Sequence, residues 1–237
     1  MVVACTYERL HLRCAKPYDT DVTPSAAIDL RRSLVAETIR RERLLVVLRR
    51  IAPQPRLVAL VEELADAGAR VFEITFDAPT AAADIAACRA TLGSRPGGIL
   101  VGAGTLRTTA ALAAALAAGA DFGVSPILDR AVLDAALERG LPFVPGAFSP
   151  TEIDAAWRAG ATFVKLFPAS SVGPDHVREL RGPLGDIELI PTGGIDAASA
   201  PAFLAAGAVA VGIGGALVNA APAARRAILE SVRRTAG

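Results

Sequence analysis

The chain has 237 residues, 52% of them hydrophobic, and a formal charge of +1 from 25 basic and 24 acidic side chains. That length suits one large domain or two small ones and allows a substantial buried core. The near-neutral charge provides no basic face for a nucleic-acid backbone, and 5% aromatic residues leave few rings to stack on bases, so nucleic-acid binding is not expected.

Signals for membranes, secretion and metals are also weak. Charges and glycines interrupt the apolar residues before any run reaches the roughly 18 residues typical of a membrane span, and the start of the sequence has no apolar core of the signal-peptide type. Three cysteines and two histidines are too few for a disulfide framework or a histidine-rich metal site. We therefore expect a cytoplasmic protein that binds neither membranes nor a metal ion.

The N-terminal part of the chain differs from the rest. Residues 1–30 show no clean hydrophobic period and contain Pro17 and Pro24, so we expect a flexible extension outside the main fold. Residues 33–43 (SLVAETIRRER) predict a short helix that leads into a domain covering residues 31–237.

From residue 44 onward, short apolar or β-branched runs alternate with Ala-rich helical stretches, a pattern typical of βα units with a parallel sheet. Turn glycines before several runs and Ser, Thr or Asp near the predicted helix starts support this division. The predicted strands are LLVVL (44–48), RVFEITF (70–76), GILVGA (98–103), DFGVS (121–125), PFVPG (142–146), TFVKLF (162–167), IELIP (187–191) and AVAVGI (208–213).

Eight strands in roughly 200 residues fit the low end of the size range of a closed barrel. An open doubly wound sheet is the alternative, but LLVVLRRIAP stands where that fold would carry a G-x-G-x-x-G after its first strand. We therefore predict an α/β fold, a (β/α)₈ TIM barrel, with its active site at the C-terminal ends of the strands.

Lys165 is the one candidate amine nucleophile inside the predicted barrel, because the only other lysine is Lys16 and arginine stays protonated. It lies late in an apolar strand, between Val164 and Leu166. A lysine there could extend to the barrel mouth or pair with a carboxylate. We favour a functional interpretation, in which a dry setting favours the neutral amine that attacks a ketone to form a Schiff base.

Glu73 is the second polar residue within a predicted strand. A buried carboxylate is costly unless it is paired or used. It could form an ion pair with Arg49 or Lys165, or act as the general acid/base that Schiff-base chemistry needs to move protons.

Other polar residues follow the strands at the predicted mouth. Arg49 and Arg50 are either solvated or available to grip a substrate carboxylate. The hydroxyl groups of Thr75 and Thr105 can donate to the same carboxylate or serve in turns. We expect four residues near strand ends to shape loops: Pro126, Pro145, Gly146 and Phe167.

Two glycine clusters, PTGGI (191–195) and GIGGAL (212–217), follow the last two predicted strands. Loops at these places form the common phosphate site of such barrels. Gly193, Gly194, Gly214 and Gly215 are therefore candidate phosphate-binding residues, although each Gly-Gly pair alone is also typical of a tight turn.

The motifs FEITF, VGAGT, VSP, VPGAFSPTE, FVKLFPAS, PTGGI and AVGIGGALV occur in this order. Together they resemble the class I pyruvate-type aldolases that act on 2-keto-3-deoxy-6-phosphogluconate or 4-hydroxy-2-oxoglutarate, over residues 44–235. The resemblance implies a homotrimeric barrel without metal or organic cofactor, with pyruvate and an aldehyde as products. It assigns the Schiff base to Lys165, acid/base catalysis to Glu73, carboxylate binding to Arg49 and Thr105, and phosphate binding to the four glycines.

Two positions depart from this pattern. Some members of the family carry an arginine soon after the glutamate strand, where this chain has Phe76-Asp77-Ala78-Pro79, and serine is common where Gly215 stands. These departures leave the substrate open. The alternatives to an aldolase are a non-catalytic barrel that binds a phosphorylated ligand, or a phosphate-binding isomerase or synthase in which Lys165 only contacts an anion.

Overall fold

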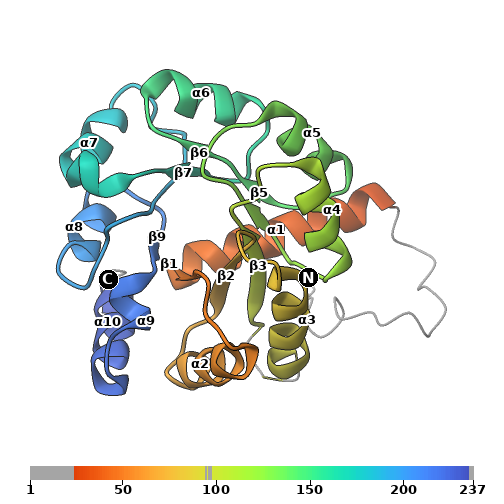
Figure 1. Ribbon diagram of the computed structural model, residues 1–237. Coiled ribbons are helices and arrows are strands. Elements are labelled where there is room, and N and C mark those ends of the chain that lie inside the picture. Colours follow the sequence, from red (N-terminus) through yellow and green to blue (C-terminus); the bar gives the residue numbers. More distant parts are fainter. Residues whose placement is uncertain (1–23, 94, 96–97, 235–237) are drawn as a thin grey trace, which may run out of the picture.

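The computed structural model describes residues 24–93, 95 and 98–234, in which strands and helices alternate along the chain (Figure 1). The strands are β1 (Leu44–Leu48), β2 (Val71–Thr75), β3 (Leu100–Gly104), β4 (Gly123–Val124), β5 (Phe143–Val144), β6 (Gly146–Ala147), β7 (Val164–Leu166), β8 (Leu189–Pro191) and β9 (Val211–Ile213). The helices are α1 (Pro24–Glu42), α2 (Gln54–Asp66), α3 (Ala81–Leu92), α4 (Thr109–Ala117), α5 (Arg130–Glu138), α6 (Pro150–Arg158), α7 (Gly173–Leu180), α8 (Ala200–Ala205), α9 (Gly215–Val218) and α10 (Pro222–Arg234), and Ala169–Ser171 forms a 3₁₀ turn. Each predicted strand overlaps an observed one, and β3 ends one residue beyond its predicted boundary.

All strand pairs are parallel, and they close into a (β/α)₈ barrel as predicted. One sheet has the order β5-β4-β3-β2-β1-β9 and the other β6-β7-β8. The two sheets join where β5 continues into β6, and where β8 meets β9 through a bridge between Thr192 and Gly212. The ring therefore has eight positions, in which β7 lies opposite β2.

The fifth predicted strand is divided in the structure. Pro145 has no N–H group to donate to a ladder, so β5 before it pairs with β4, whereas β6 after it pairs with β7. The Pro145 carbonyl accepts a hydrogen bond from the Lys165 backbone N–H at 2.9 Å. This break lets one chain segment change neighbours and fixes the backbone beside Lys165.

Alternation along the strands separates two apolar layers. Residues such as Val71 and Phe163 point into the barrel and form one buried cluster with α1. Their chain neighbours, such as Phe72 and Val164, point outward and pack against the surrounding helices. Because side chains alternate along a strand, Glu73 and Lys165, two residues after Val71 and Phe163, also point into the barrel.

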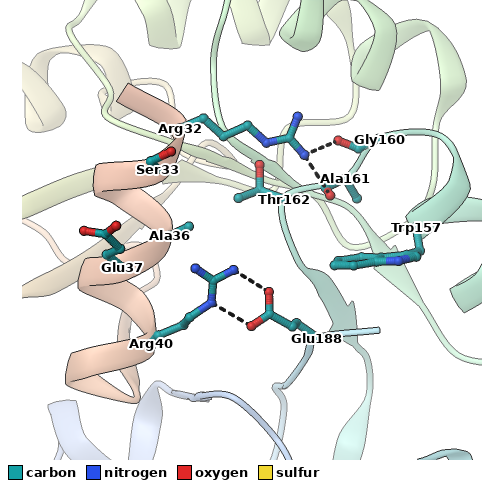
Figure 2. A pocket seen from close by; sticks show the side chains of 10 residues that line it. All are labelled: Arg32, Ser33, Ala36, Glu37, Arg40, Trp157, Gly160, Ala161, Thr162 and Glu188. Atoms are coloured by element: carbon teal, nitrogen blue, oxygen red, sulfur yellow. Dashed lines mark hydrogen bonds and ion pairs between the residues drawn. The ribbon is translucent and has the colours of Figure 1, made fainter. Parts of the chain in front are cut away.

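Helix α1 closes the N-terminal end of the barrel. Its Val35, Ala36 and Ile39 are buried against interior residues near the strand starts. Between α1, the segment before β7 and Glu188 before β8 lies a cavity of about 390 Å³ (Figure 2). The cavity therefore lies at the end opposite the C-terminal ends of the strands.

The start of α1 corrects the predicted boundary of the N-terminal extension. The helix begins at Pro24, earlier than the predicted residue 33, so residues 24–30 are helical rather than part of an irregular extension. Alanine, leucine and arginine favour this helix, and its buried stripe packs under the barrel. Residues 1–23 of the predicted extension lie outside the described residues. None of the described helices has the length and apolar character that crossing a membrane requires.

Helix ends follow the expected local signals. Thr108 and Asp129 accept hydrogen bonds from the backbone N–H three residues later, and Ser149 forms a reciprocal capping box with Glu152. The glycines expected at helix ends have positive φ, as that role requires: Gly68, Gly119, Gly140, Gly160 and Gly207.

Candidate active site

Lys165 and Glu73 meet inside the barrel. They reach toward each other from the opposite strands β7 and β2, and Lys165 Nζ lies 3.7 Å from Glu73 Oε1. Only 6% of the lysine side chain and 1% of the glutamate side chain are exposed. The barrel thus holds an amine and a carboxyl group together in a nearly dry setting, as the sequence predicts.

The two groups lie at ion-pair distance but do not form a hydrogen bond with each other. A separation of 3.7 Å is an ion-pair distance but exceeds that of a hydrogen bond, and Glu73 Oε1 is buried with no hydrogen-bond partner among the described residues. Lys165 Nζ also lies 5.3 Å from the centre of the Phe167 ring. A buried polar atom without a hydrogen-bond partner is unusual, so Glu73 Oε1 is available to hydrogen-bond to a bound molecule.

Gly104 makes room for the Glu73 carboxyl group. A Cβ atom at this position of β3 would lie 2.0 Å from Glu73 Oε1 and 2.6 Å from its Cδ, closer than atoms can approach. Sequence reasoning missed this residue, although VGAGT contains it, because the clash exists only once β2 and β3 are paired. Gly104 is therefore part of the site through its missing side chain.

Arg49 lies at the mouth, half exposed, and is held by two partners. Its Nη1 contacts Asp77 Oδ2 at 2.6 Å, and its Nη2 donates to the Thr105 hydroxyl at 3.3 Å. Arg50 Nε lies 3.2 Å from the same Asp77 oxygen. The structure therefore brings Arg49 and Thr105 together, as their shared predicted role requires, and adds Asp77, which sequence reasoning noted only as a departure from a family pattern.

The charges around Asp77 affect its ionisation. Burial favours the neutral acid, but the Thr75 hydroxyl and the Arg49 and Arg50 guanidinium groups together hold the pKa of Asp77 below its usual value. The Thr75 hydroxyl, which is buried, also lies 3.3 Å from the Leu48 carbonyl oxygen. Thr75 thus has protein acceptors for its proton, which weakens its predicted role as a donor to substrate.

The two glycine clusters lie side by side at the mouth, after β8 and β9. Gly193 and Gly194 have φ of +98° and +72°, which side chains rarely adopt. A Cβ atom on Gly194 would lie 2.6 Å from Ser170 Oγ, so this loop packs on the segment that follows Lys165. Gly214 and Gly215 begin the short helix α9, and a Cβ on Gly215 would meet only Asn219 Nδ2, at 3.7 Å. The hydroxyl group of Ser170 therefore lies beside the loop of Gly193 and Gly194. The sequence analysis did not single out Ser170.

The residues expected to shape loops lie around Lys165. Gly146 is part of β6, paired with Lys165 itself, rather than in a loop. The Pro126 carbonyl oxygen packs against Gly146. A Cβ atom on Gly146 would lie only 2.2 Å from that oxygen, so a larger residue would clash there. Phe167 packs between Lys165 and the loop of Gly193. In the described part of the chain, no three His, Cys, Asp or Glu side chains gather closely enough to hold a metal ion.

Known proteins share this architecture and sequence pattern. A family model described as "KDPG and KHG aldolase" matches residues 35–230, most of the chain. A probable 2-dehydro-3-deoxy-6-phosphogalactonate aldolase of Rhizobium meliloti (strain 1021) is 34% identical over 175 residues, which span 73% of this chain and 81% of that protein.

Two solved structures are similar in fold and sequence. A 4-hydroxy-2-oxoglutarate/2-dehydro-3-deoxyphosphogluconate aldolase from TTHB1 has a TM-score of 0.75 and 31% identity, covering 85% of this chain and 98% of that chain. KDPG aldolase from Legionella pneumophila, with pyruvate captured as a covalent carbinolamine intermediate, has a TM-score of 0.72 and 25% identity, covering 84% and 97%.

Proposed function

Because this chain belongs to the KDPG and KHG aldolase family and is a Schiff-base aldolase of the pyruvate type, we propose that it cleaves a phosphorylated 2-keto-3-deoxy sugar acid. The products are pyruvate and glyceraldehyde 3-phosphate. The observation that carries the proposal is the buried Lys165–Glu73 pair, with 3.7 Å between Nζ and Oε1. It supplies an amine nucleophile and, beside it, a group that moves protons.

The reaction begins at the keto carbon. The neutral Lys165 amine attacks C2, and the resulting carbinolamine loses water to form a protonated imine. Glu73 takes the proton of the C4 hydroxyl group, directly or through a water molecule, as the C3–C4 bond breaks. The bonding electrons move into the iminium, so the aldehyde leaves and an enamine remains. Protonation at C3 and hydrolysis of the imine then release pyruvate and restore the lysine.

Substrate orientation follows from the residues at the mouth. The Arg49 guanidinium and the Thr105 hydroxyl are placed together and are suited to the carboxylate next to the keto carbon. The Gly193–Gly194 and Gly214–Gly215 loops offer backbone N–H groups to the phosphate at the other end of the substrate. Ser170 adds a hydroxyl group beside the first of these loops.

Covalent trapping tests the mechanism. Borohydride added with pyruvate should reduce the imine and attach pyruvate irreversibly to Lys165, which peptide mass spectrometry would locate. Lys165→Ala should give no adduct and no cleavage activity. A variant that stays active without this lysine, or activity abolished by EDTA, would contradict the mechanism. A protein that neither forms the adduct nor cleaves the sugar acid would instead support a non-catalytic barrel or a phosphate-binding isomerase or synthase.

The missing hydroxyl group at Gly215 favours a second candidate substrate, the unphosphorylated 4-hydroxy-2-oxoglutarate, which yields pyruvate and glyoxylate. Comparing kcat/KM for the two substrates decides between them, and we expect the phosphorylated acid to be preferred. Since the space at Gly215 is open, Gly215→Ser should lower KM for the phosphorylated acid alone, with Gly215→Ala as control. A preference for 4-hydroxy-2-oxoglutarate would overturn the phosphate assignment while leaving the aldolase chemistry intact.

Assembly and location are further parts of the proposal. The family resemblance supports a homotrimer, and two large apolar side chains, Ile127 and Phe148, are 50% and 40% exposed on loops at the barrel mouth. Sedimentation of the purified protein would measure the mass of the assembly. A cytoplasmic location is expected from the composition and is tested by cell fractionation.

A further inference from the structure

The ends of three neighbouring strands gather a charged cluster that the lysine chemistry does not use directly. Arg49 follows β1, Asp77 follows β2, and Thr105 follows β3. Val47, two residues before Arg49, is the strand partner of Glu73. Side chains two residues apart on a strand share a face, so Arg49 stands on the side of β1 that faces the acid/base, one step nearer the mouth.

Asp77 restrains the Arg49 guanidinium. One carboxylate oxygen of Asp77 accepts from Arg49 and also contacts Arg50, while only 15% of the Asp77 side chain is exposed. The opposite terminal nitrogen of Arg49 donates to Thr105. A guanidinium has five N–H donors in a rigid fork, so both ends of the fork are fixed while other donors stay available to a ligand.

The backbone on both sides of the cluster is strained. Arg50 has φ of +52° and Thr105 has φ of +59°, the left-handed region that residues other than glycine rarely adopt. Such conformations persist only where surrounding contacts hold them, and they concentrate at ligand-binding positions. Both strained residues belong to the cluster, because Arg50 contacts Asp77 and Thr105 accepts from Arg49.

The charges of the site leave a place for one anion. At the mouth, Arg49 and Arg50 carry two positive charges, and the Asp77 carboxylate, whose pKa is lowered, balances one of them. Without Asp77, the two exposed arginines would repel each other, and Arg49 would lose the contact that holds its Nη1 end. A flexible arginine must be ordered when ligand binds, and ordering a side chain lowers affinity.

We propose that Asp77 is a positioning residue that holds Arg49 ready for the carboxylate of the 2-oxo acid. This inference rests on the proposed function, because it concerns the same substrate. Asp77 contacts Arg49, Arg50 and Thr75 rather than Lys165 or Glu73, so its loss should weaken substrate binding and leave the chemical steps nearly unchanged. In this respect Asp77 differs from Lys165 and Glu73, whose loss should lower kcat.

The test measures pyruvate binding and turnover separately in Asp77→Ala, Asp77→Asn, Arg49→Ala and the double variant Asp77→Ala/Arg49→Ala. The fraction of enzyme trapped by borohydride at increasing pyruvate concentration gives half-saturation, and steady-state cleavage gives kcat and KM. Asp134→Ala, which removes an exposed ion pair on α5, is the matched control. Thermal unfolding confirms that each variant is folded.

We expect Asp77→Ala to raise half-saturating pyruvate and KM about tenfold, the scale of one charge-assisted contact, with kcat changed less than about threefold. Asp77→Asn, which keeps an oxygen acceptor, should lose less. Because Asp77 acts through Arg49, the double variant should be no worse than Arg49→Ala alone. The Asp134 control should match the wild type.

Three outcomes would overturn the inference: unchanged half-saturation in Asp77→Ala, a loss confined to kcat, or effects of Asp77→Ala and Arg49→Ala that add. In each case the wild-type protein would still be trapped by pyruvate, and the aldolase mechanism would stand. A wild-type protein that forms no adduct would instead contradict the proposed function itself.

Discussion

The two ends of the barrel differ in their acidic side chains: both oxygens of Glu188 at the N-terminal end accept from Arg40, whereas Glu73 Oε1 in the site has no hydrogen-bond partner among the described residues. The two hydrogen bonds from Arg40 to Glu188 measure 2.7 and 2.6 Å, and Arg32 at the same end donates to the Gly160 and Ala161 carbonyl oxygens (Figure 2). Glu73 lies at ion-pair distance from Lys165, but a buried oxygen that lacks a hydrogen bond is unusual, and such groups concentrate at functional sites.

Strained backbone occurs at both ends, because Arg43, just before β1, also has a positive φ of +58°, but the two ends differ in what lies against them. The C-terminal end uses Gly104 to create space and holds Arg50 and Thr105 in unfavourable conformations. The N-terminal end is covered by α1, a regular helix with a buried apolar stripe. Substitutions at the C-terminal end should therefore change activity, and substitutions under α1 should change stability.

The largest expected effect is that of Glu73→Gln. The amide keeps the shape of the side chain but cannot take up a proton, so kcat should fall about 10²–10⁴-fold, the usual contribution of general acid–base catalysis. Steady-state cleavage assays measure the change. Glu188→Gln, at the other end of the barrel, is the control and should leave kcat unaltered. Wild-type turnover in Glu73→Gln would show that another group moves the protons.

The corresponding test at the N-terminal end is Ile39→Ala. This side chain is fully buried between α1 and the barrel interior, so its truncation should lower the free energy of unfolding by about 2–5 kcal/mol. Denaturant unfolding measures the loss, and kcat per folded molecule should stay the same. Ile28→Ala, on the exposed part of the same helix, should cost far less. Equal losses in both variants would show that α1 does not pack as described.

Gly104→Ala should reduce the catalytic rate by displacing the Glu73 carboxyl group. The added Cβ would lie 2.0 Å from Glu73 Oε1, so the carboxyl group must move. A displacement of about 1 Å can cost about 10²-fold in rate, which kcat measurements would detect. Gly182→Ala, where the new atom meets only the Glu179 carbonyl oxygen at 3.4 Å, is the control. Full activity of Gly104→Ala would mean that Glu73 does not act from the observed position.

The smallest effect concerns the pH dependence of stability at Asp77. Because its pKa is lowered in the folded protein, the carboxylate contributes stability above its unfolded pKa of about 3.9, which is lost as pH falls through the folded pKa. At pH 7 the wild type should be more stable than Asp77→Asn, and the difference should shrink below about pH 4. Unfolding curves between pH 7 and 3 measure it. A constant difference over that range would contradict the ion pairs with Arg49 and Arg50.

Much of the fold could be predicted from sequence because its signals are local. Apolar runs separated by Ala-rich stretches locate the strands, and glycines with positive φ end the helices where expected. Lys165 could be singled out because burying a charged ammonium group within an apolar strand is unfavourable unless the group is paired or used. The start of α1 was misplaced, since that helix is stabilised by packing under a barrel that no local pattern reveals.

The sequence by itself determined the repeating βα units and the chemical types available to the site. Only the tertiary structure decided that Lys165 and Glu73 meet across the barrel, that Gly104 leaves room for the carboxyl group, and that Asp77 holds Arg49. The physical reason is that these contacts join strands far apart in the chain. Their distances depend on the strand register and on how the sheet closes. The hydrophobic periodicity of a single segment specifies neither of these.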